Sequence, residues 1–403
     1  MEIYLVKTGS ADASEIDLSE LYLAYYIAHD YPEAKPGGEG DQFEFVGGGS
    51  YLDNGGTNYL AFRILENLIG TVAESAAQYT SNPESPTADS QVVAQMTGAY
   101  VVNVNKQSVE DIKKLIRTHG SVSASIWMPQ SAYYNKIENV NGPVGYSSTN
   151  ACLYGHSTVA NHDILLVGWD DGFSRNNFVD GLRPENNGAW KARNSWGTGF
   201  GNGGYFWVSY EDYALAATDA TVYRAINSSS KIDGSDDKEE VPDFCYSYDK
   251  IPDNDAYEDS TAWVLKAASP AVMEQLFTTD GNEKILSVGV ETGTAGVRID
   301  VTVKVKPTDG TGPEVTATGV EASAAYRGFY RIRLNDPLEV AVESTATVTV
   351  KYTAAGKTII VPYEPKNKRY TANGYRYTTG QGSDGFRFGT EGQLTDQDRK
   401  SVV

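Results

Sequence analysis

The sequence predicts an α+β protein in which a region of mixed helices and strands precedes an all-β sandwich. Before residue 227, short segments with helix start and stop signals alternate with short apolar runs bounded by Gly, Asp and Asn. From Phe244 to Glu364, apolar and polar residues alternate, and no helix-period stretch of comparable strength occurs. Because such alternation is typical of half-buried antiparallel strands, we expect a sandwich of about 120 residues there.

The expected helices carry recognisable boundary residues. A capping-box variant, Asp17-x-x-Glu20, opens one of them, and Gly9 ends the first. His119, followed by Gly120, is interpreted as the end of a helix rather than as a ligand. The helices are expected over residues 1–8, 17–28, 57–68 and 108–119.

Strands are expected after the last of these helices and again in the sandwich. The sandwich strands are marked by alternating apolar residues. They are Val297, Ile299, Val301, Val303 and Val305, then Tyr330, Ile332 and Leu334, then Val348, Val350 and Tyr352. The earlier strands are expected over 121–127, 161–169, 188–193 and 203–210.

The composition also predicts the domain boundaries. A polar and acidic stretch with a run of serines, Ser228 to Ser230, has the character of a linker. The predicted parts are a first domain at 1–226, a linker at 227–243, the sandwich at 244–364 and a polar, Gly-rich tail at 365–403, in which Tyr375, Tyr377, Phe386 and Phe388 are candidate residues of a closing strand.

The charge balance excludes some partners. Lys plus Arg is 33 and Asp plus Glu is 53, which gives a formal net charge of −20. Such an acidic chain argues against nucleic acid or an anionic membrane as a partner. With only two cysteines there is no disulfide framework, no apolar run approaches the roughly 20 residues that span a bilayer, and no signal peptide follows Met1.

Polar residues at the ends of two expected strands suggest a catalytic site. His162 lies just before the apolar run Ile164 to Val167, and Asn194 lies just after the short run at 188–193. We therefore expect two strands to present these side chains to one another. Histidine titrates near neutral pH, and an amide bonded to one ring nitrogen fixes the tautomer and aims the other nitrogen at a nucleophile. The pair therefore matches two parts of a Cys-His-Asn site.

The motifs around this pair resemble those of papain-like cysteine peptidases. The similarity rests on Asn-His-x-x-x-x-Val-Gly-Trp from Asn161, then Asn-Ser-Trp-Gly from Asn194, then Gly-Gly-Tyr-Phe from Gly203. It implies a two-lobe fold with a helical left lobe and a β-rich right lobe, His162 as general base, Asn194 as its orienting partner, and Trp196 as a shield for their hydrogen bond. Asp163 departs from the family, which usually has Ala there. Its carboxylate either acts on the base or points to solvent.

The same resemblance implies that the nucleophile is missing. In the family, the Cys begins a long central helix and a Trp follows it, whereas the sequence near Met1 has neither. Residues Asp17 to Glu20 resemble the segment after that helix, so Met1 is expected to lie inside it, with a Cys-Trp pair on the order of ten residues upstream in a complete form. A chain without this Cys and the oxyanion-hole Gln is predicted to be inactive.

A substrate-binding segment is expected at Asn54, Gly55 and Gly56. In the family an Asn-Gly-Gly at this point leaves backbone groups open to an extended substrate, and a side chain there would block the approach. The simpler interpretation is a turn that precedes the helix at 57–68. The substrates implied by the resemblance are proteins or peptides.

Cys152 offers a different nucleophile, ten residues before His162. Its sequence context does not place it at a helix N-terminus, where the helix dipole lowers a thiol pKa. A metal site of Cys152, His156 and His162 lacks a fourth ligand at a suitable spacing, so no metal site is predicted.

The C-terminal part resembles the lectin-like domain that follows the peptidase domain in some bacterial and archaeal cell-surface cysteine peptidases. The similarity is carried by Tyr-Ser-Tyr-Asp from Tyr246, by residues 326–334, and by Ile-Ile-Val-Pro from Ile359. It implies an extracellular or cell-surface location and a binding or spacer module, with cell-wall or surface polysaccharide as a partner. No cofactor is required for the peptidase chemistry. Calcium, which some relatives bind in this domain, is a candidate without identifiable ligands here.

Three functions remain open from the sequence. The first is a papain-like peptidase that lacks its nucleophile in this chain. The second is a non-catalytic cell-surface or carbohydrate-binding protein built on a decayed peptidase fold. The third is an enzyme that uses Cys152 and loses its activity when that thiol is alkylated. The retention of His162, Asn194 and Trp196 favours the first.

Overall fold

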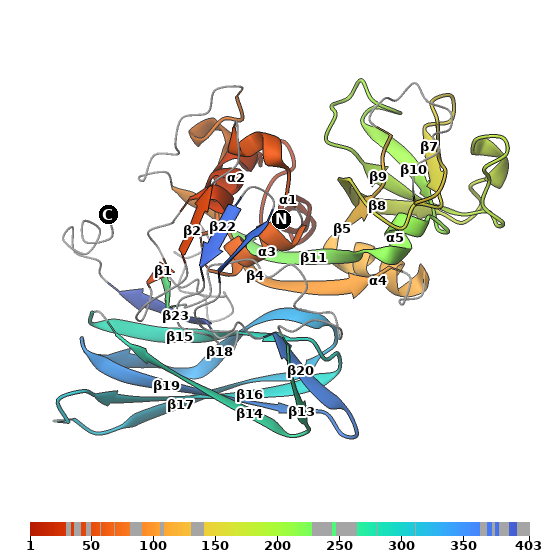
Figure 1. Cartoon of the computed structure of the whole chain (residues 1–403). Coiled ribbons are helices and arrows are strands. Elements are labelled where there is room, and N and C mark those ends of the chain that lie inside the picture. Colours follow the sequence, from red (N-terminus) through yellow and green to blue (C-terminus); the bar gives the residue numbers. More distant parts are fainter. Residues whose placement is uncertain are drawn as a thin grey trace. The chain divides into compact units, whose positions relative to one another are not determined.

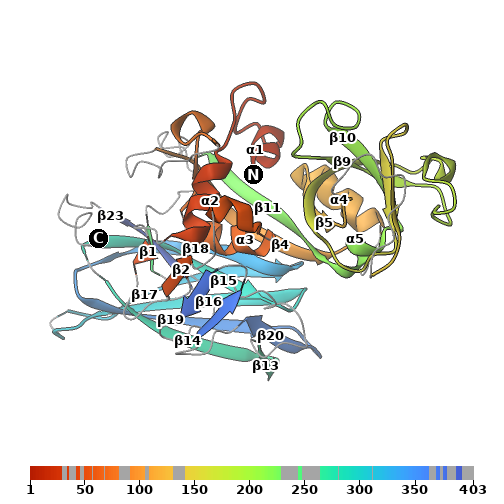
Figure 2. The ribbon, with the colours of Figure 1, turned by 45° about the horizontal axis from the view of Figure 1, so that its top comes forward.

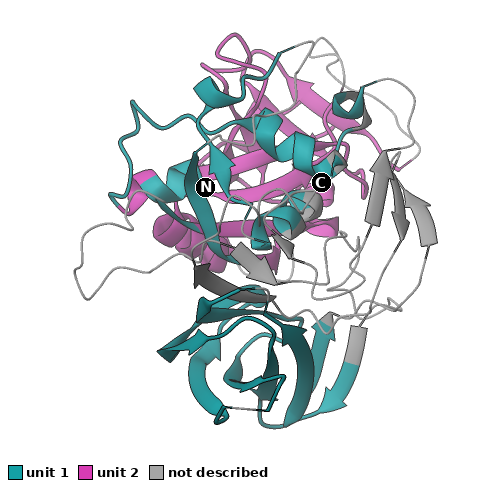
Figure 3. Cartoon of the chain, turned by 90° about the vertical axis from the view of Figure 1, so that its left-hand side faces the viewer, with its two compact units in different colours: residues 1–5, 9–99, 225–403 teal, residues 6–8, 100–224 magenta. Residues whose placement is uncertain are grey.

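The chain forms two compact units in a computed structural model. Unit 1 contains residues 1–5, 9–99 and 225–403, and unit 2 contains residues 6–8 and 100–224 (Figure 3). The element order is mixed helix and strand followed by strands alone, which confirms the predicted α+β class (Figure 1). The structure describes residues 1–29, 34–35, 42–45, 50–56, 58–67, 69–80, 91–104, 109–129, 141–227, 244–246, 264–279, 281–310, 312–362, 369–372, 375–378 and 387–392.

Unit 2 is built on a sheet with the strand order β11-β5-β8-β9-β10-β7-β6. Helix α4 packs on this sheet with Ile112, Leu115 and Ile116 buried, as the helix period predicts. The bounds are α4 Val109–His119, β5 Val122–Ile126, β6 Val144–Ser147, β7 Cys152–Gly155, β8 His162–Asp170, η3 Arg175–Asn177, β9 Ala189–Arg193, β10 Tyr205–Ser209, α5 Tyr213–Ala217 and β11 Asp219–Asn227.

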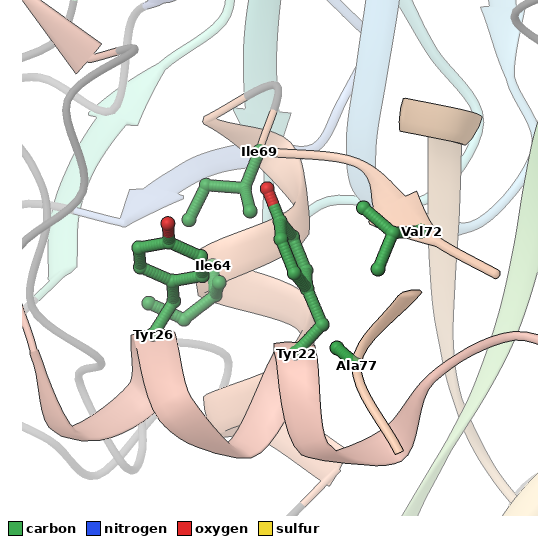
Figure 4. Close-up of a cluster of buried hydrophobic side chains, with 6 residues drawn as sticks. All are labelled: Tyr22, Tyr26, Ile64, Ile69, Val72 and Ala77. Carbon is green, nitrogen blue, oxygen red and sulfur yellow. The ribbon is translucent and has the colours of Figure 1, made fainter. Parts of the chain in front are cut away.

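The helical part of unit 1 packs around aromatic side chains. Tyr22 and Tyr26 of helix α2 are buried against Ile64, Ile69 and Val72 (Figure 4). The two rings meet edge to face at 4.9 Å between centroids, an arrangement that aromatic pairs favour. The bounds are α1 Glu2–Lys7, α2 Glu20–Ala28, η1 Tyr51–Asn54, α3 Asn58–Glu66, β3 Thr71–Val72, η2 Glu74–Ala76 and β4 Val92–Asn103.

The N-cap of α2 differs from the one predicted. Ser19, not Asp17, caps the helix, because its hydroxyl accepts a hydrogen bond from the backbone N–H of Tyr22 at 3.0 Å. Asp17 instead accepts at its backbone carbonyl, from the N–H of Glu74 at 2.8 Å. The helix therefore starts at Glu20, two residues later than an N-cap at Asp17 indicated.

The remainder of unit 1 is a β-sandwich. The four-stranded sheet β14-β19-β16-β17 lies against β15 and β18 (Figures 1 and 2). The alternating apolar residues predicted on three of these strands are all buried. The bounds are β13 Val264–Ala268, β14 Ala271–Thr278, β15 Glu283–Thr292, β16 Val297–Pro307, β17 Val315–Ala324, β18 Arg327–Val340, β19 Ser344–Thr353 and β20 Thr358–Pro362.

Short strands occur at the predicted linker boundary and in the predicted tail. Strand β23 pairs antiparallel with β15, so part of the segment after residue 364 continues the sandwich sheet. Tyr375, Tyr377 and Phe388 lie on strands, while Phe386 is outside the described residues. The bounds are β1 Ala34–Lys35, β2 Gln42–Phe45, β12 Phe244–Tyr246, β21 Arg369–Ala372, β22 Tyr375–Thr378 and β23 Arg387–Gly392.

Candidate active site

His162 and Asn194 meet at one end of an antiparallel strand pair. His162 is the first residue of β8, and Asn194 follows the last residue of β9. In an antiparallel pair the start of one strand lies beside the end of its neighbour, and the register joins Leu165 to Arg193. The predicted proximity is confirmed, since His162 Nε2 lies 2.8 Å from Asn194 Oδ1.

A second hydrogen bond fixes the orientation of the amide. The backbone N–H of Ser195 donates to Asn194 Oδ1 at 2.8 Å, so this atom is the acceptor oxygen. The imidazole must then donate from Nε2, and the neutral ring carries its lone pair on Nδ1. Within the described part of the chain, Nδ1 of His162 has no hydrogen-bond partner. The arrangement leaves a basic nitrogen available for a proton from a thiol.

A backbone hydrogen bond and burial fix the position of Asn194. Its N–H donates to Gly204 O at 3.0 Å, and the residue is only 5% exposed. Its Nδ2 is buried and has no partner among the described residues. Gly204 has a φ of 90°, a region that favours glycine, so the turn before β10 depends on this residue type.

Trp196 lies against the imidazole of His162. The ring centroids are 5.0 Å apart, and the planes are tilted by 42°. Phe200 supports the indole from the side in an edge-to-face contact at 5.0 Å. The indole remains 43% exposed, so it covers one side of the His162 ring and leaves its own outer face in solvent.

Asn161 extends the strand pairing that positions His162. Its Oδ1 accepts from the N–H of Met128 at 2.7 Å, and its Nδ2 donates to Met128 O at 3.0 Å. The side chain thereby pairs with the backbone just beyond β5, while Ile126 faces His162 in the strand register. From the sequence, Asn161 was noted only as part of a motif. A side-chain amide that forms hydrogen bonds with the backbone of a neighbouring segment leaves no pattern in the spacing of apolar and polar residues.

Asp163 points to the other face of β8. The register pairs it with Ser125 of β5, whose hydroxyl donates to Asp163 Oδ1. Successive side chains of a strand alternate between faces, so the carboxylate is on the opposite face from the imidazole. The sequence left open whether this carboxylate acts on His162 or points to solvent. In the structure Asp163 is exposed, and it also accepts a hydrogen bond from Ser125.

Cys152 is enclosed rather than reactive. It is fully buried at the start of β7, and its Sγ–H donates to Asn177 O at 3.1 Å. Burial raises the pKa of the Cys152 thiol to about 12, although a hydrogen bond with Ser147 opposes this. The thiolate is the nucleophilic form of cysteine, and this environment disfavours it. Cys152 is therefore a poor candidate for a catalytic residue.

The segment between β8 and β9 supplies the cover over Cys152. Phe178 and Leu182 are buried with Cys152 and Tyr154 in one cluster, and Phe173 packs against it. The apolar side chains of the segment are therefore packed on β7, while most of its other residues are exposed.

His156 is occupied by aromatic neighbours. His156 Nε2 lies 3.0 Å from Tyr154 Oη, and its ring stacks on Tyr213 at 4.6 Å. Among the residues that the structure describes, no group of three or more His, Cys, Asp or Glu is placed to hold a metal ion.

The Asn-Gly-Gly segment belongs to the other compact unit. Asn54 is the last residue of η1, and Gly55 follows with a φ of 66°. Gly55 and Gly56 are exposed, and no heavy atom lies within 4 Å of a Cβ built on Gly55. Their role in substrate binding stays a prediction.

Comparisons with known proteins match two successive parts of the chain. Residues 51–225 match the papain family cysteine protease profile, and residues 257–385 match the lectin like domain profile. The structure of an alanine variant of the clostridial cysteine protease Cwp84, after propeptide cleavage, has a TM-score of 0.66 and 19% identity over 97% of this chain and 92% of that chain. The cysteine protease and lectin-like domains of Cwp84, a surface layer associated protein of Clostridium difficile, give 0.65 and 22% over 97% and 82%. A search of curated proteins gave no match.

Proposed function

Because the chain carries a papain-family cysteine protease domain followed by a lectin-like domain, we propose that His162 and Asn194 are the base and its orienting partner in a peptidase site for protein or peptide substrates. The observation that carries this proposal is the 2.8 Å contact between His162 Nε2 and Asn194 Oδ1. It leaves Nδ1 as the nitrogen that accepts a proton.

The geometry supports a defined sequence of proton transfers. A thiol placed against Nδ1 gives its proton to His162, and the thiolate attacks the peptide carbonyl. Asn194 Oδ1 then holds the Nε2–H of the imidazolium, which keeps the ring aimed at the reacting atoms. The same imidazolium protonates the leaving amine. Trp196 shields one side of this ring from water, which strengthens the hydrogen bond.

The 403-residue polypeptide supplies only this base half of the site in our proposal. Cys152 is buried with a raised pKa, and the side chain of Cys245 lies outside the described residues. We therefore expect no thiol-dependent hydrolysis of fluorogenic peptides by this polypeptide, and no labelling by an active-site-directed epoxide. Loss of one member of such a triad typically lowers the rate by several orders of magnitude. Hydrolysis that disappears in both His162→Ala and Cys152→Ser would overturn this proposal.

Asn54, Gly55 and Gly56 are proposed to pair with the backbone of an extended substrate. The exposure of the two glycines and the positive φ of Gly55 support this role. Gly56→Val should weaken the binding of an extended peptide in isothermal titration calorimetry without lowering the melting temperature. Gly281→Val, a glycine change in the sandwich, is the matched control and should leave binding unchanged. Equal binding by both variants would argue for a plain turn.

We propose an extracellular or cell-surface location, with surface polysaccharide as a partner of the lectin-like domain. The surface-layer association stated for Cwp84 supports the location. In the described part of the chain, no helix is long and apolar enough to cross a membrane. Calcium stays a prediction without assigned ligands, since the described residues offer no ligand cluster. The preserved His162 to Asn194 contact favours a peptidase over a decayed binding protein.

A further inference from the structure

Strand β18 of the sandwich is shared with the sheet that continues into the N-terminal region. Within the largest sheet, β18 lies between β15 and β4 and is hydrogen-bonded to both neighbours. Residues 92–99 of β4 and all of β18 belong to unit 1. The sandwich is thus joined to the N-terminal region by strand pairing as well as by the chain.

Side chains from helix α3 reinforce this junction. Phe62 of α3 and Phe329 of β18 are both fully buried, and their rings meet edge to face at 6.4 Å. Burial of a Phe side chain removes a large apolar surface from water, so these two rings are substantial contributors to the junction.

Arg331 adds a polar contact at the end of the same helix. Its Nη2 donates to the carbonyl oxygen of Glu66, the last residue of α3, at 3.1 Å. A cation suits this position because the carbonyls of a last helical turn lack intrahelical partners and carry partial negative charge. The guanidinium also lies 5.3 Å from the centroid of Phe329, within the range of a cation–π contact.

We propose that β18 and α3 form a docking surface that holds the sandwich on the N-terminal part of unit 1 without help from the covalent linker. The partner of this surface is therefore the chain's own N-terminal region, in particular helix α3 and strand β4. The pairings of β1 with β12 and of β2 with β22 join the same two parts of the chain, so the substitution of Arg331 is what assigns the contact to β18 and α3. The sandwich stays packed on that region and stabilises it, whereas the sequence suggested a spacer or an independent binding module. Its removal would expose Phe62 and an edge of β4, an aggregation-prone combination.

Cutting the linker in the intact protein tests this directly. A site-specific protease sequence is placed between Ser230 and Asp236, the full chain carries a C-terminal affinity tag, and the folded protein is cleaved. We expect the two pieces to elute together in size-exclusion chromatography and to be captured together through the tag. Separation of two folded pieces at micromolar concentration would overturn the proposal.

Matched arginine substitutions locate the surface. In the cleaved protein, Arg331→Ala should raise the concentration at which half of the N-terminal piece is lost from the tag by about tenfold, the change expected for one lost charged hydrogen bond. Arg298→Ala is the control, because Arg298 pairs with Asp300 of its own strand. Near-ultraviolet circular dichroism before cleavage checks that each variant folds. Equal retention by both variants would contradict the assignment of the surface to Arg331 and α3.

Discussion

His162 and Cys152 each begin a strand of the same sheet, yet their surroundings are opposite. Each is the first residue of its strand, β8 and β7 respectively. His162 has one ring nitrogen fixed by Asn194 and the other without a partner in the described structure. Cys152 is fully buried, and its S–H donates to a backbone carbonyl. A position at the end of a strand therefore does not make a nucleophile or base reactive. Its reactivity depends on whether neighbouring side chains bury it.

The largest expected effect is the resistance of the buried Cys152 thiol to alkylation. Burial raises the pKa of Cys152 from an ordinary value of 9.0 to about 12. At pH 8 the thiolate fraction should therefore be about a thousandfold lower than for an ordinary thiol. We expect iodoacetamide to leave Cys152 unmodified in the folded chain and to modify it readily in urea, as measured by peptide mass spectrometry.

The cover over Cys152 supplies the control for that experiment. Phe178→Ala removes a buried ring from the cluster around the thiol and should increase its labelling rate. Phe277→Ala removes a fully buried ring from the sandwich instead, so it should not change labelling of Cys152. Rapid labelling of Cys152 in the unmodified fold would make the third function, an enzyme that uses this thiol, tenable again.

Several elements of the fold were predictable because their signals are local and periodic. Alternation on β16, β18 and β19, and the helix period of α4, agree with the buried residues found. Proximity of His162 and Asn194 followed from strand ends that must meet in an antiparallel pair.

The features that escaped prediction depend on tertiary contacts. The segment after β8 has no period, so nothing in its spacing shows that Phe178 and Leu182 pack over Cys152. Ser19 and Asp17 are both good N-cap residues, and only the backbone path selects Ser19. The pairing of Asp163 with Ser125 required the register of β5 and β8, which one sequence does not specify.

His119 extends the comparison to a histidine that is desolvated. It ends α4, and its ring meets Tyr100 edge to face at 5.5 Å. Burial, with a smaller contribution from the Arg224 cation, lowers the pKa of His119 from 6.5 to about 4. The unfolded chain therefore binds a proton before the folded chain does as the pH falls. The stability that His119 contributes is fully present above pH 6.5 and is lost between pH 6.5 and 4.

This pH dependence is measurable with one substitution. Between about pH 7.5 and 4.5 the wild-type protein should lose about 2 kcal/mol more unfolding free energy than His119→Gln. Urea unfolding followed by tryptophan fluorescence at both pH values gives the difference. If wild type and variant lose stability equally, His119 is protonated in the folded state and its environment is more hydrated than the structure indicates.

A subtler effect concerns the proton on His162. Asn194 Oδ1 accepts from both Nε2 of His162 and the N–H of Ser195, so the neutral imidazole should carry its proton on Nε2. Asn194→Ala removes this acceptor and should shift the tautomer populations toward the Nδ1–H form, at a cost of about 1 kcal/mol for the lost hydrogen bonds. Nitrogen-15 shifts of the imidazole report the tautomer directly, with His162→Gln to assign the signals. Asn186→Ala, a change at an exposed amide that bonds Glu211, should leave them unmoved. An Nδ1–H imidazole in the wild-type protein would place the proton on the nitrogen that has to accept one from a thiol, and His162 would then be held in the wrong form for a general base.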